Sequence, residues 1–514
     1  MVENHQNTLF KYCCGRLLKR LSKGEILFLS ASGPIAVFCS FFLMPVIRFS
    51  GAITLFILFL ITGCQAETDN ISRFSFRKMV VEYSENPINI DESHPRFSWI
   101  ISSNGRNQVQ SACRILVASS IFNLNNSRGD LWDSEWIESG ETIQHEYGNN
   151  NLQSNRIYYW RVIVRTGNNQ TYKSPVAKFE TSLLAQSDWQ ATWIGKGSPS
   201  EPLPRQGFYK DIKEQFLGAD SITHDGNSLL LRREIGLKKK IRSARAFVTG
   251  VGFYEFFING NRVGDHVLAP AKTPYHKYIL YDTYDITPLL RQGNNALGIH
   301  LGNGWYNPYK KWWNDYRMQW FGSKKAIAQI HVTYTDGTTQ LVTTDKNWLW
   351  APGPVTYNCV YDGEVYDANL AHQGWTKTGY DASLWKPVTV FDQARVRLAS
   401  HRMPPVKVNE HFKPVEVEVS KAGMKVYDMG QNFAGWVRIK VQGKKNTVLK
   451  IRFAEDLYAD GTIDVTSNEH AKATAEYVMK GGQPESYEPS FTWFGFRYVE
   501  ITALDGPLNI LDFE

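Results

Sequence analysis

Short runs rich in β-branched and aromatic residues recur at regular spacing along the chain, and turn-rich connections separate them. This spacing constrains the fold more than any other feature of the sequence. Asn259-Gly260 and Asp336-Gly337 lie between such runs as two-residue hairpin turns, in which glycine supplies the positive φ. Helical periodicity is weak after residue 63, and the one helix-like stretch, 468–477, is short. Evenly spaced strands with turn signals are typical of β-sandwiches. The sequence therefore predicts an all-β chain.

The predicted strands fall into three groups. Because a single core stops growing at ~250–300 residues, a chain of 514 residues is expected to form about three domains. We expect tandem β-sandwiches over 76–187, 193–400 and 405–514. The first is fibronectin type III-like, with 158–164 as its core strand, whose aromatic residues are expected to pack in the core. The strands expected in it are 78–81, 96–100, 112–118, 156–164 and 177–181.

The N-terminal region carries targeting signals. An apolar run at 51–61 ends in Ile-Thr-Gly-Cys at 61–64, after which the sequence turns polar. A charged, then apolar, then small-residue order is typical of a signal peptide, and Cys64 in this position resembles a bacterial lipobox. We expect a targeting region at 1–63, lipidation of Cys64 and a linker at 64–75.

These signals predict a bacterial cell-envelope lipoprotein, held to the membrane by its lipid and facing the periplasm or the cell surface. A single membrane-spanning anchor is the alternative, but the run is shorter than the ~20 apolar residues that a span needs. A second apolar run lies upstream at 26–43, and Met44 is expected to be the true start codon.

Charge and cysteine content exclude other classes. The net charge is +7, but after residue 63 the chain has 51 basic and 48 acidic residues. No basic stripe is left to bind a phosphate backbone, so nucleic acid is not an expected partner. Cys113 and Cys359 fall in different predicted domains, and we expect two buried free thiols, with one disulfide between them as the alternative.

Several long motifs resemble one protein family. They are TGVGFYEFFINGNRVGD at 249–265, YDTYDIT at 281–287, LGNGWY at 301–306, YDGEVYDA at 361–368, YDMGQNFAGW at 427–436 and FTWFGFRYV at 491–499. In this order they resemble the bacterial α-L-rhamnosidases, an inverting glycoside hydrolase family. The resemblance implies a galactose-binding-like jelly roll over 193–400 and a concanavalin-like sandwich over 405–514. It also implies a substrate class, rhamnose-containing glycans.

The family continues into an (α/α)6 catalytic barrel, which the resemblance does not locate in these residues. No catalytic residue is therefore assigned by matching, and the chain is expected to be inactive alone, with a separately encoded catalytic module as one expected partner. The alternatives are a lipid-anchored carbohydrate-binding protein and a structural, adhesin-like array. Carboxyl groups that could act as a pair occur at 362–367 and 455–456, but a structural or sugar-binding role is favoured for them.

A sugar-binding site is expected where aromatic rings and polar groups crowd together. Rhamnose presents an apolar face and a methyl group to a ring, and hydroxyls to amides and acids. The residues expected to bind carbohydrate are Asn303, Trp305, Tyr306, Asn358, Tyr361, Asp362 and Glu364, and the rings of Trp312 and Trp313 are equally compatible with the site or with loop packing. No cofactor is expected, except that oxygens of Asn303, Asn358 and Asp362 would also suit calcium.

Overall fold

The computed structural model describes residues 74–106, 108–197, 227–307, 322–391, 396–417, 424–504, 506 and 508–514. Residues Ser72–Glu514 form one compact unit. Its regular structure is almost entirely β-strand, and the α-helix within the described ranges is α3 (Ile121–Asn125). The predicted all-β class is therefore confirmed. Over these same ranges, no helix combines the length and the apolar content that crossing a membrane requires.

Several predictions fall outside the described residues. They are the targeting region 1–63, the start at Met44, the lipidation of Cys64, the greater part of the linker 64–75, and the roles of Trp312 and Trp313. These stay predictions. Cys113 and Cys359 are described, and both are buried free thiols, as expected.

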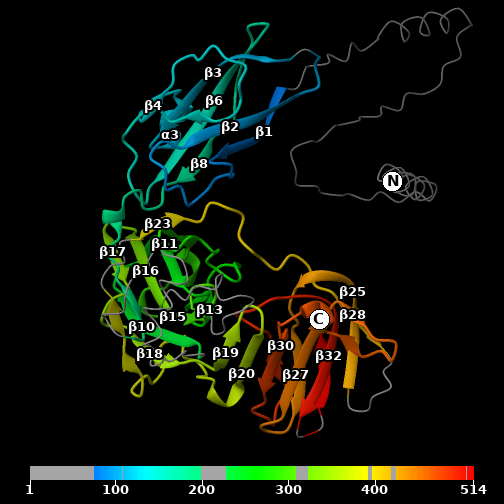
Figure 1. Cartoon of the computed structure of the whole chain (residues 1–514). Coiled ribbons are helices and arrows are strands. Elements are labelled where there is room, and N and C mark those ends of the chain that lie inside the picture. Colours follow the sequence, from blue (N-terminus) through cyan, green and yellow to red (C-terminus); the bar gives the residue numbers. More distant parts are fainter. Residues whose placement is uncertain are drawn as a thin grey trace, which may run out of the picture. The chain divides into compact units, whose positions relative to one another are not determined.

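The first sandwich pairs a sheet of order β1-β2-β5 with a sheet of order β4-β3-β6-β7, in which β8 also pairs with β6 (Figure 1). In β6 the side chains of Tyr158, Trp160 and Val162 are buried and those between them are partly exposed, so the predicted core strand is confirmed. The Phe97 and Trp160 rings pack at 4.8 Å. The strands are β1 (Phe74–Val81), β2 (Arg96–Ser103), β3 (Gln110–Ala118), β4 (Trp132–Asp133), β5 (His145–Glu146), β6 (Ile157–Thr166), β7 (Thr171–Lys173) and β8 (Ala177–Glu180).

The second sandwich consists of two sheets. One has the order β13-β12-β15-β10-β18-β21, and the other has the order β22-β9-β16-β11-β14-β23, in which β17 also pairs with β16. The predicted hairpin turn joins β12 to β13, with φ of 53° at Asn259 and 89° at Gly260. The strands are β9 (Trp193–Gly195), β10 (Leu229–Leu237), β11 (Ile241–Val251), β12 (Tyr254–Ile258), β13 (Asn261–Arg262), β14 (Tyr278–Asp285), β15 (Gly293–Leu301), β16 (Lys325–Tyr334), β17 (Thr339–Thr343), β18 (Leu349–Pro352), β21 (Lys386–Pro387), β22 (Thr389–Phe391) and β23 (Arg397–Ser400).

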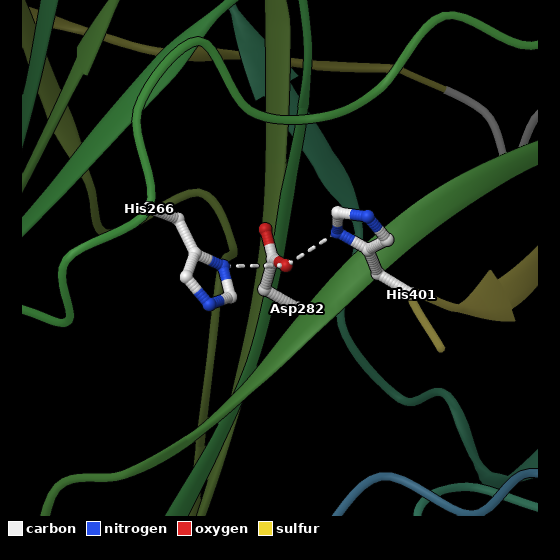
Figure 2. Close-up of side chains that lie close together, drawn as sticks. All are labelled: His266, Asp282 and His401. Atoms are coloured by element: carbon white, nitrogen blue, oxygen red, sulfur yellow. Dashed lines mark hydrogen bonds and ion pairs between the residues drawn. The ribbon is translucent and has the colours of Figure 1, made fainter. Parts of the chain in front are cut away.

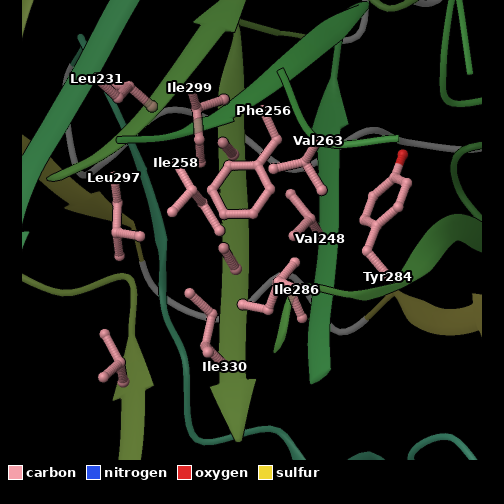
Figure 3. Packing of buried hydrophobic residues seen from close by; sticks show 14 of the residues in the cluster. Leu231, Val248, Phe256, Ile258, Val263, Tyr284, Ile286, Leu297, Ile299 and Ile330 are labelled. Atoms are coloured by element: carbon pink, nitrogen blue, oxygen red, sulfur yellow. The ribbon is translucent and has the colours of Figure 1, made fainter. Parts of the chain in front are cut away.

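Alternation along these strands builds the core of the second sandwich. Figure 3 shows Phe256 and Ile299 of one sheet facing Val248, Tyr284 and Ile330 of the other. Successive strand side chains point to opposite faces, so a period of two places one set in the core. Such a core stabilises mainly by removing apolar surface from water.

The third sandwich packs a sheet of order β19-β20-β30-β27-β32-β25-β24 against a sheet of order β31-β26-β33. The helix-like stretch 468–477 ends in a strand, β30 (Thr474–Val478), in which Ala475 and Tyr477 are buried in alternation. The other strands are β19 (Val355–Cys359), β20 (Gly363–Asp367), β24 (Val415–Val417), β25 (Met424–Gly435), β26 (Ile439–Gly443), β27 (Val448–Ala454), β31 (Glu485–Tyr487), β32 (Phe494–Leu504) and β33 (Leu508–Phe513).

The hairpin β19–β20 joins a sheet that the sequence boundaries do not predict for it. Its residues lie within the range 193–400 expected for the second sandwich, yet β20 pairs in parallel with β30 of the third. Gly363 has φ of 115°, and a Cβ atom there would meet the Thr474 carbonyl oxygen, so glycine is required at this crossing point.

Candidate functional site

The structure brings together the two segments in which carbohydrate contacts were predicted. Asn303 follows the end of β15, and Asn358 lies in β19. The Asn303 backbone N–H donates to Asn358 Oδ1 at 2.6 Å, and Asn303 Nδ2 donates to the Asn358 carbonyl at 2.8 Å. This pair of hydrogen bonds ties the loop after β15 to the hairpin β19–β20.

Four of the seven predicted residues are polar groups inside the protein. Asn303, Asn358, Asp362 and Glu364 each expose 2% or less of their surface. Lys324 Nζ donates to Asn303 Oδ1 at 2.8 Å, which completes a buried cluster of amides and an ammonium group. Buried polar groups are stable only when they are paired, and the amides and the ammonium group of this cluster are paired with one another. The structure gives these groups partners inside the fold. Their contact with a sugar stays a prediction.

The carboxyl groups of the hairpin are held in the same way. Asp362 accepts hydrogen bonds from the Tyr357 hydroxyl at 2.8 Å and from the Lys472 backbone N–H at 3.3 Å. Glu364 Oε2 accepts from the backbone N–H groups of Ser490 and Phe491 at 3.1 and 3.0 Å. These bonds connect the hairpin to the third sandwich, so both acids act here as internal links.

Glu364 is the most perturbed carboxyl group of this region. Burial raises its pKa to about 8, although the N–H groups of Phe491 and Ser490 favour the ionised form. Strongly shifted carboxyls often mark catalytic sites. Here desolvation inside a joint between two sandwiches explains the shift.

The aromatic members of the predicted site divide into core and surface. Tyr306 is buried and its ring packs on Tyr275 at 5.2 Å. Trp305 and Tyr361 are half-buried, with ring centroids 5.7 Å apart, and Lys272 Nζ lies 4.7 Å from the Trp305 ring. Of the predicted set, these two rings reach the surface.

Calcium binding by Asn303, Asn358 and Asp362 stays a prediction, but two of their oxygens already have partners inside the fold. A calcium site needs six to eight free oxygen ligands. Asn303 Oδ1 accepts from the Lys324 ammonium and Asn358 Oδ1 accepts from Asn303 N–H, so these oxygens are engaged, one of them by a cation. Within the described ranges, the group of His, Cys, Asp and Glu side chains close enough to hold a metal is His266, Asp282 and His401, outside the predicted site.

A pocket that the sequence analysis did not single out lies on the third sandwich, beside β25. Its volume is about 290 Å³. Trp436 is half-buried there, and its Nε1 donates to Glu488 Oε1 at 2.7 Å. The rings of Phe412 and Phe433 pack at 4.8 Å beside it. The polar residues of its wall include Gln431, Glu488 and Arg438. The motif at 427–436 contains several residues of this pocket, but it was noted only for its family resemblance and not as a binding site.

The chain matches three family models in order. They are the Rha78A-like N-terminal immunoglobulin domain at residues 76–185, the alpha-L-rhamnosidase N-terminal domain at 239–410 and the bacterial alpha-L-rhamnosidase concanavalin-like domain at 419–513. The expected fibronectin type III-like module shares its sandwich architecture with immunoglobulin domains. The chain therefore belongs to the α-L-rhamnosidase family, whose N-terminal modules it comprises.

Relatives support the same assignment. An alpha-L-rhamnosidase of Formosa agariphila is 34% identical over 454 residues, which are 86% of this chain and 47% of that protein. The structure of the alpha-L-rhamnosidase from Dictyoglumus thermophilum matches with 33% identity and a TM-score of 0.75, over 85% of this chain and 48% of that one. That of Streptomyces avermitilis, complexed with L-rhamnose, matches with 26% identity and a TM-score of 0.74, over 84% and 56%. The chain spans about half the length of the curated relatives it matches.

We predict that Glu364→Gln changes how stability depends on pH. The folded-state pKa is about 8 and the unfolded one ~4.3, so the folded chain retains a proton that the unfolded chain loses. The stability that this group contributes is complete below ~pH 4.3 and is lost as pH rises through about 8. Wild type should therefore lose up to about 4 kcal/mol relative to Glu364→Gln between ~pH 5 and ~pH 8.

Urea unfolding of residues 72–514 across this range measures the difference. The exposed Glu85→Gln is the control, and its difference from wild type should stay flat. A flat difference for Glu364→Gln as well would contradict the buried, protonated carboxyl.

Proposed function

We propose that this chain forms the rhamnose-directed, non-catalytic modules of an α-L-rhamnosidase and binds rhamnose-containing glycans. One observation carries the proposal: three modules of that family follow one another in order across the chain. The name of the relatives and the L-rhamnose complex of the Streptomyces avermitilis protein point to the same sugar. The family supports rhamnose-containing glycans as the substrate class, and the pocket and exposed rings of the described residues suggest where a sugar could bind.

The pocket beside Trp436 is the binding site that we propose. It combines an aromatic platform with an amide, a carboxyl and a guanidinium group, and it is open to solvent. The apolar face and methyl group of a deoxyhexose pack on a ring, while its hydroxyls pair with polar side chains. The Trp436 indole is oriented by Glu488, which reduces the entropy that binding would otherwise cost. The half-buried pair Trp305 and Tyr361 remains the second candidate, since its two rings reach the surface.

We predict weak binding of L-rhamnose that depends on Trp436. A small neutral sugar in an open pocket should bind in the millimolar to micromolar range, about 4–8 kcal/mol. Removing the ring in Trp436→Ala should weaken binding by about 1–3 kcal/mol. Calorimetric titration of residues 72–514 measures this, with Trp136→Ala, an exposed tryptophan on the first sandwich, as the control.

The outcomes separate the two candidate surfaces. Binding that survives Trp436→Ala but is lost in Trp305→Ala would move the site to the predicted Trp305–Tyr361 surface. Binding that neither variant changes would contradict both. Circular dichroism of each variant shows whether a loss reflects unfolding.

We also propose that hydrolysis depends on a catalytic module outside these 514 residues, on the same chain or on a separate one. Asp362 and Glu364 are buried internal links, and Glu455 Oε1 accepts from Asn432 Nδ2 at 3.1 Å. Inverting hydrolysis needs two carboxyl groups ~6.5–9.5 Å apart across a bound sugar. These acids do not offer such a pair around an open pocket.

Purified residues 72–514 should therefore release no rhamnose from an aryl rhamnoside, as followed by the absorbance of the aryl alcohol. The rate of aryl alcohol release should be the same with the protein as with buffer alone. Turnover that disappears in Glu364→Gln or in Glu455→Gln would show that the chemistry lies within this chain.

The anchor is the third part of the proposal. The order of a charged segment, an apolar run and Ile-Thr-Gly-Cys at 61–64 supports lipidation at Cys64 and a place in the cell envelope. A lipid anchor would hold glycan-binding modules at a membrane surface.

Cys64→Ser should abolish incorporation of labelled fatty acid and leave an uncleaved precursor. Expression in a bacterium with labelled palmitate, followed by electrophoresis, measures both. Cys113→Ser is the matched control, because a buried thiol should not be labelled. Label that persists in Cys64→Ser would place the lipid elsewhere.

A further inference from the structure

Three side chains from distant parts of the chain converge in the second sandwich. Asp282 lies in β14, His266 follows β13, and His401 follows β23. Figure 2 shows the two imidazole rings reaching the same carboxyl oxygen. His266 Nδ1 lies 3.0 Å from Asp282 Oδ1, and His401 Nδ1 lies 2.9 Å from it. The three atoms lie within 4.8 Å of one another.

The carboxyl group at the centre is buried. Asp282 exposes 2% of its surface. Its two oxygens accept hydrogen bonds from His266 Nδ1, His401 Nδ1 and the Tyr254 hydroxyl. Among the described residues, the ion-pair partners of Asp282 are these two histidines. A buried carboxyl oxygen with an imidazole nitrogen on either side is a favourable place for a cation.

We propose that His266 Nδ1, His401 Nδ1 and Asp282 Oδ1 bind a divalent transition-metal ion, with Zn²⁺ as the expected species. Two imidazoles and one carboxylate are a ligand set that zinc commonly takes, with water in the fourth position. Ligand bonds of about 2.0–2.1 Å at tetrahedral angles place neighbouring ligand atoms about 3.3 Å apart. The N–O distances of 2.9 and 3.0 Å are within a few tenths of an ångström of that spacing.

The surroundings fit a metal site as well as the ligands do. The Tyr254 hydroxyl donates to Asp282 Oδ2 at 2.5 Å, while Oδ1 accepts from the two imidazole N–H groups, whose protons the metal would displace. Asp265 Oδ1 lies 4.0 Å from His266 Nε2, on the side of the ring that faces away from the site. The Tyr254 hydrogen bond is an outer contact of the kind that orients metal ligands, whereas 4.0 Å is too long for a hydrogen bond between Asp265 and His266.

The position of His401 gives the metal a structural role. The Asn89 side chain of the first sandwich donates to the His401 carbonyl at 2.7 Å, and the Val267 N–H donates to the Val406 carbonyl at 2.9 Å. The metal therefore fastens the segment after β23 to the second sandwich, at the place where the first sandwich also contacts that segment. Metal binding that is coupled to folding in this way stabilises the folded state.

The test uses residues 72–514 stripped with a chelator and then titrated with Co²⁺ and Zn²⁺. Wild type should bind one Co²⁺ and gain visible absorption typical of a tetrahedral site, and Zn²⁺ should displace it and raise the unfolding temperature. Ca²⁺ should do neither, because the site offers two nitrogen ligands. In His266→Ala the affinity for Zn²⁺ should fall at least about 100-fold.

The controls keep the outcome decisive. The exposed His411→Ala removes a histidine outside the cluster and should bind Zn²⁺ as wild type does. If His266→Ala fails to fold, X-ray absorption of zinc-loaded wild type decides, because the site requires two imidazole ligands. Absence of Co²⁺ absorption in folded wild type, equal losses in both variants, or fewer than two imidazoles would overturn the proposal and leave a hydrogen-bonded triad only.

Discussion

The hairpin β19–β20 holds the second and third sandwiches together. Asn358 on one of its strands is hydrogen-bonded to Asn303 of the second sandwich, while β20 extends the main sheet of the third. Glu364 adds bonds to the backbone of Ser490 and Phe491, and Phe491 packs with Phe253 and Val355 in a small apolar cluster between the two modules. Two sandwiches that share a hairpin and a buried polar joint are expected to behave as one body, because opening the joint would expose several paired groups at once.

Several residues that were predicted to bind sugar instead lie in this buried contact between the two sandwiches. Amides, carboxyls and aromatic rings occur together in a saccharide pocket and also in a buried polar joint, and composition alone does not separate the two. In this chain the polar members bond to one another and to backbone groups, although Glu364 Oε1 has no hydrogen-bond partner among the described residues. Among the described residues, the two surfaces that we consider for a glycan are the Trp305 and Tyr361 rings and the pocket beside Trp436.

Local patterns predicted the fold well and the environment of the site poorly. Alternation identified β6, and Asn259-Gly260 identified its hairpin, because both signals depend only on neighbouring residues. The predicted meeting of Asn303 with the hairpin was also observed. Burial was not predictable, because alternation shows which residues share a face and not whether another sheet covers it. Neither was the His266–Asp282–His401 cluster, whose members are brought together only by the long-range strand order.

Recognition of rhamnose by the chain can be tested on an array of immobilised glycans that differ only in the terminal sugar. Labelled residues 72–514 present the described modules together, and multivalent display on the array compensates for the weak affinity of a single site. We expect the labelled protein to bind only glycans that end in rhamnose, and we expect free L-rhamnose to compete for this binding. Equal signal on glycans that end in other neutral sugars, or no signal on any of them from folded protein, would contradict it.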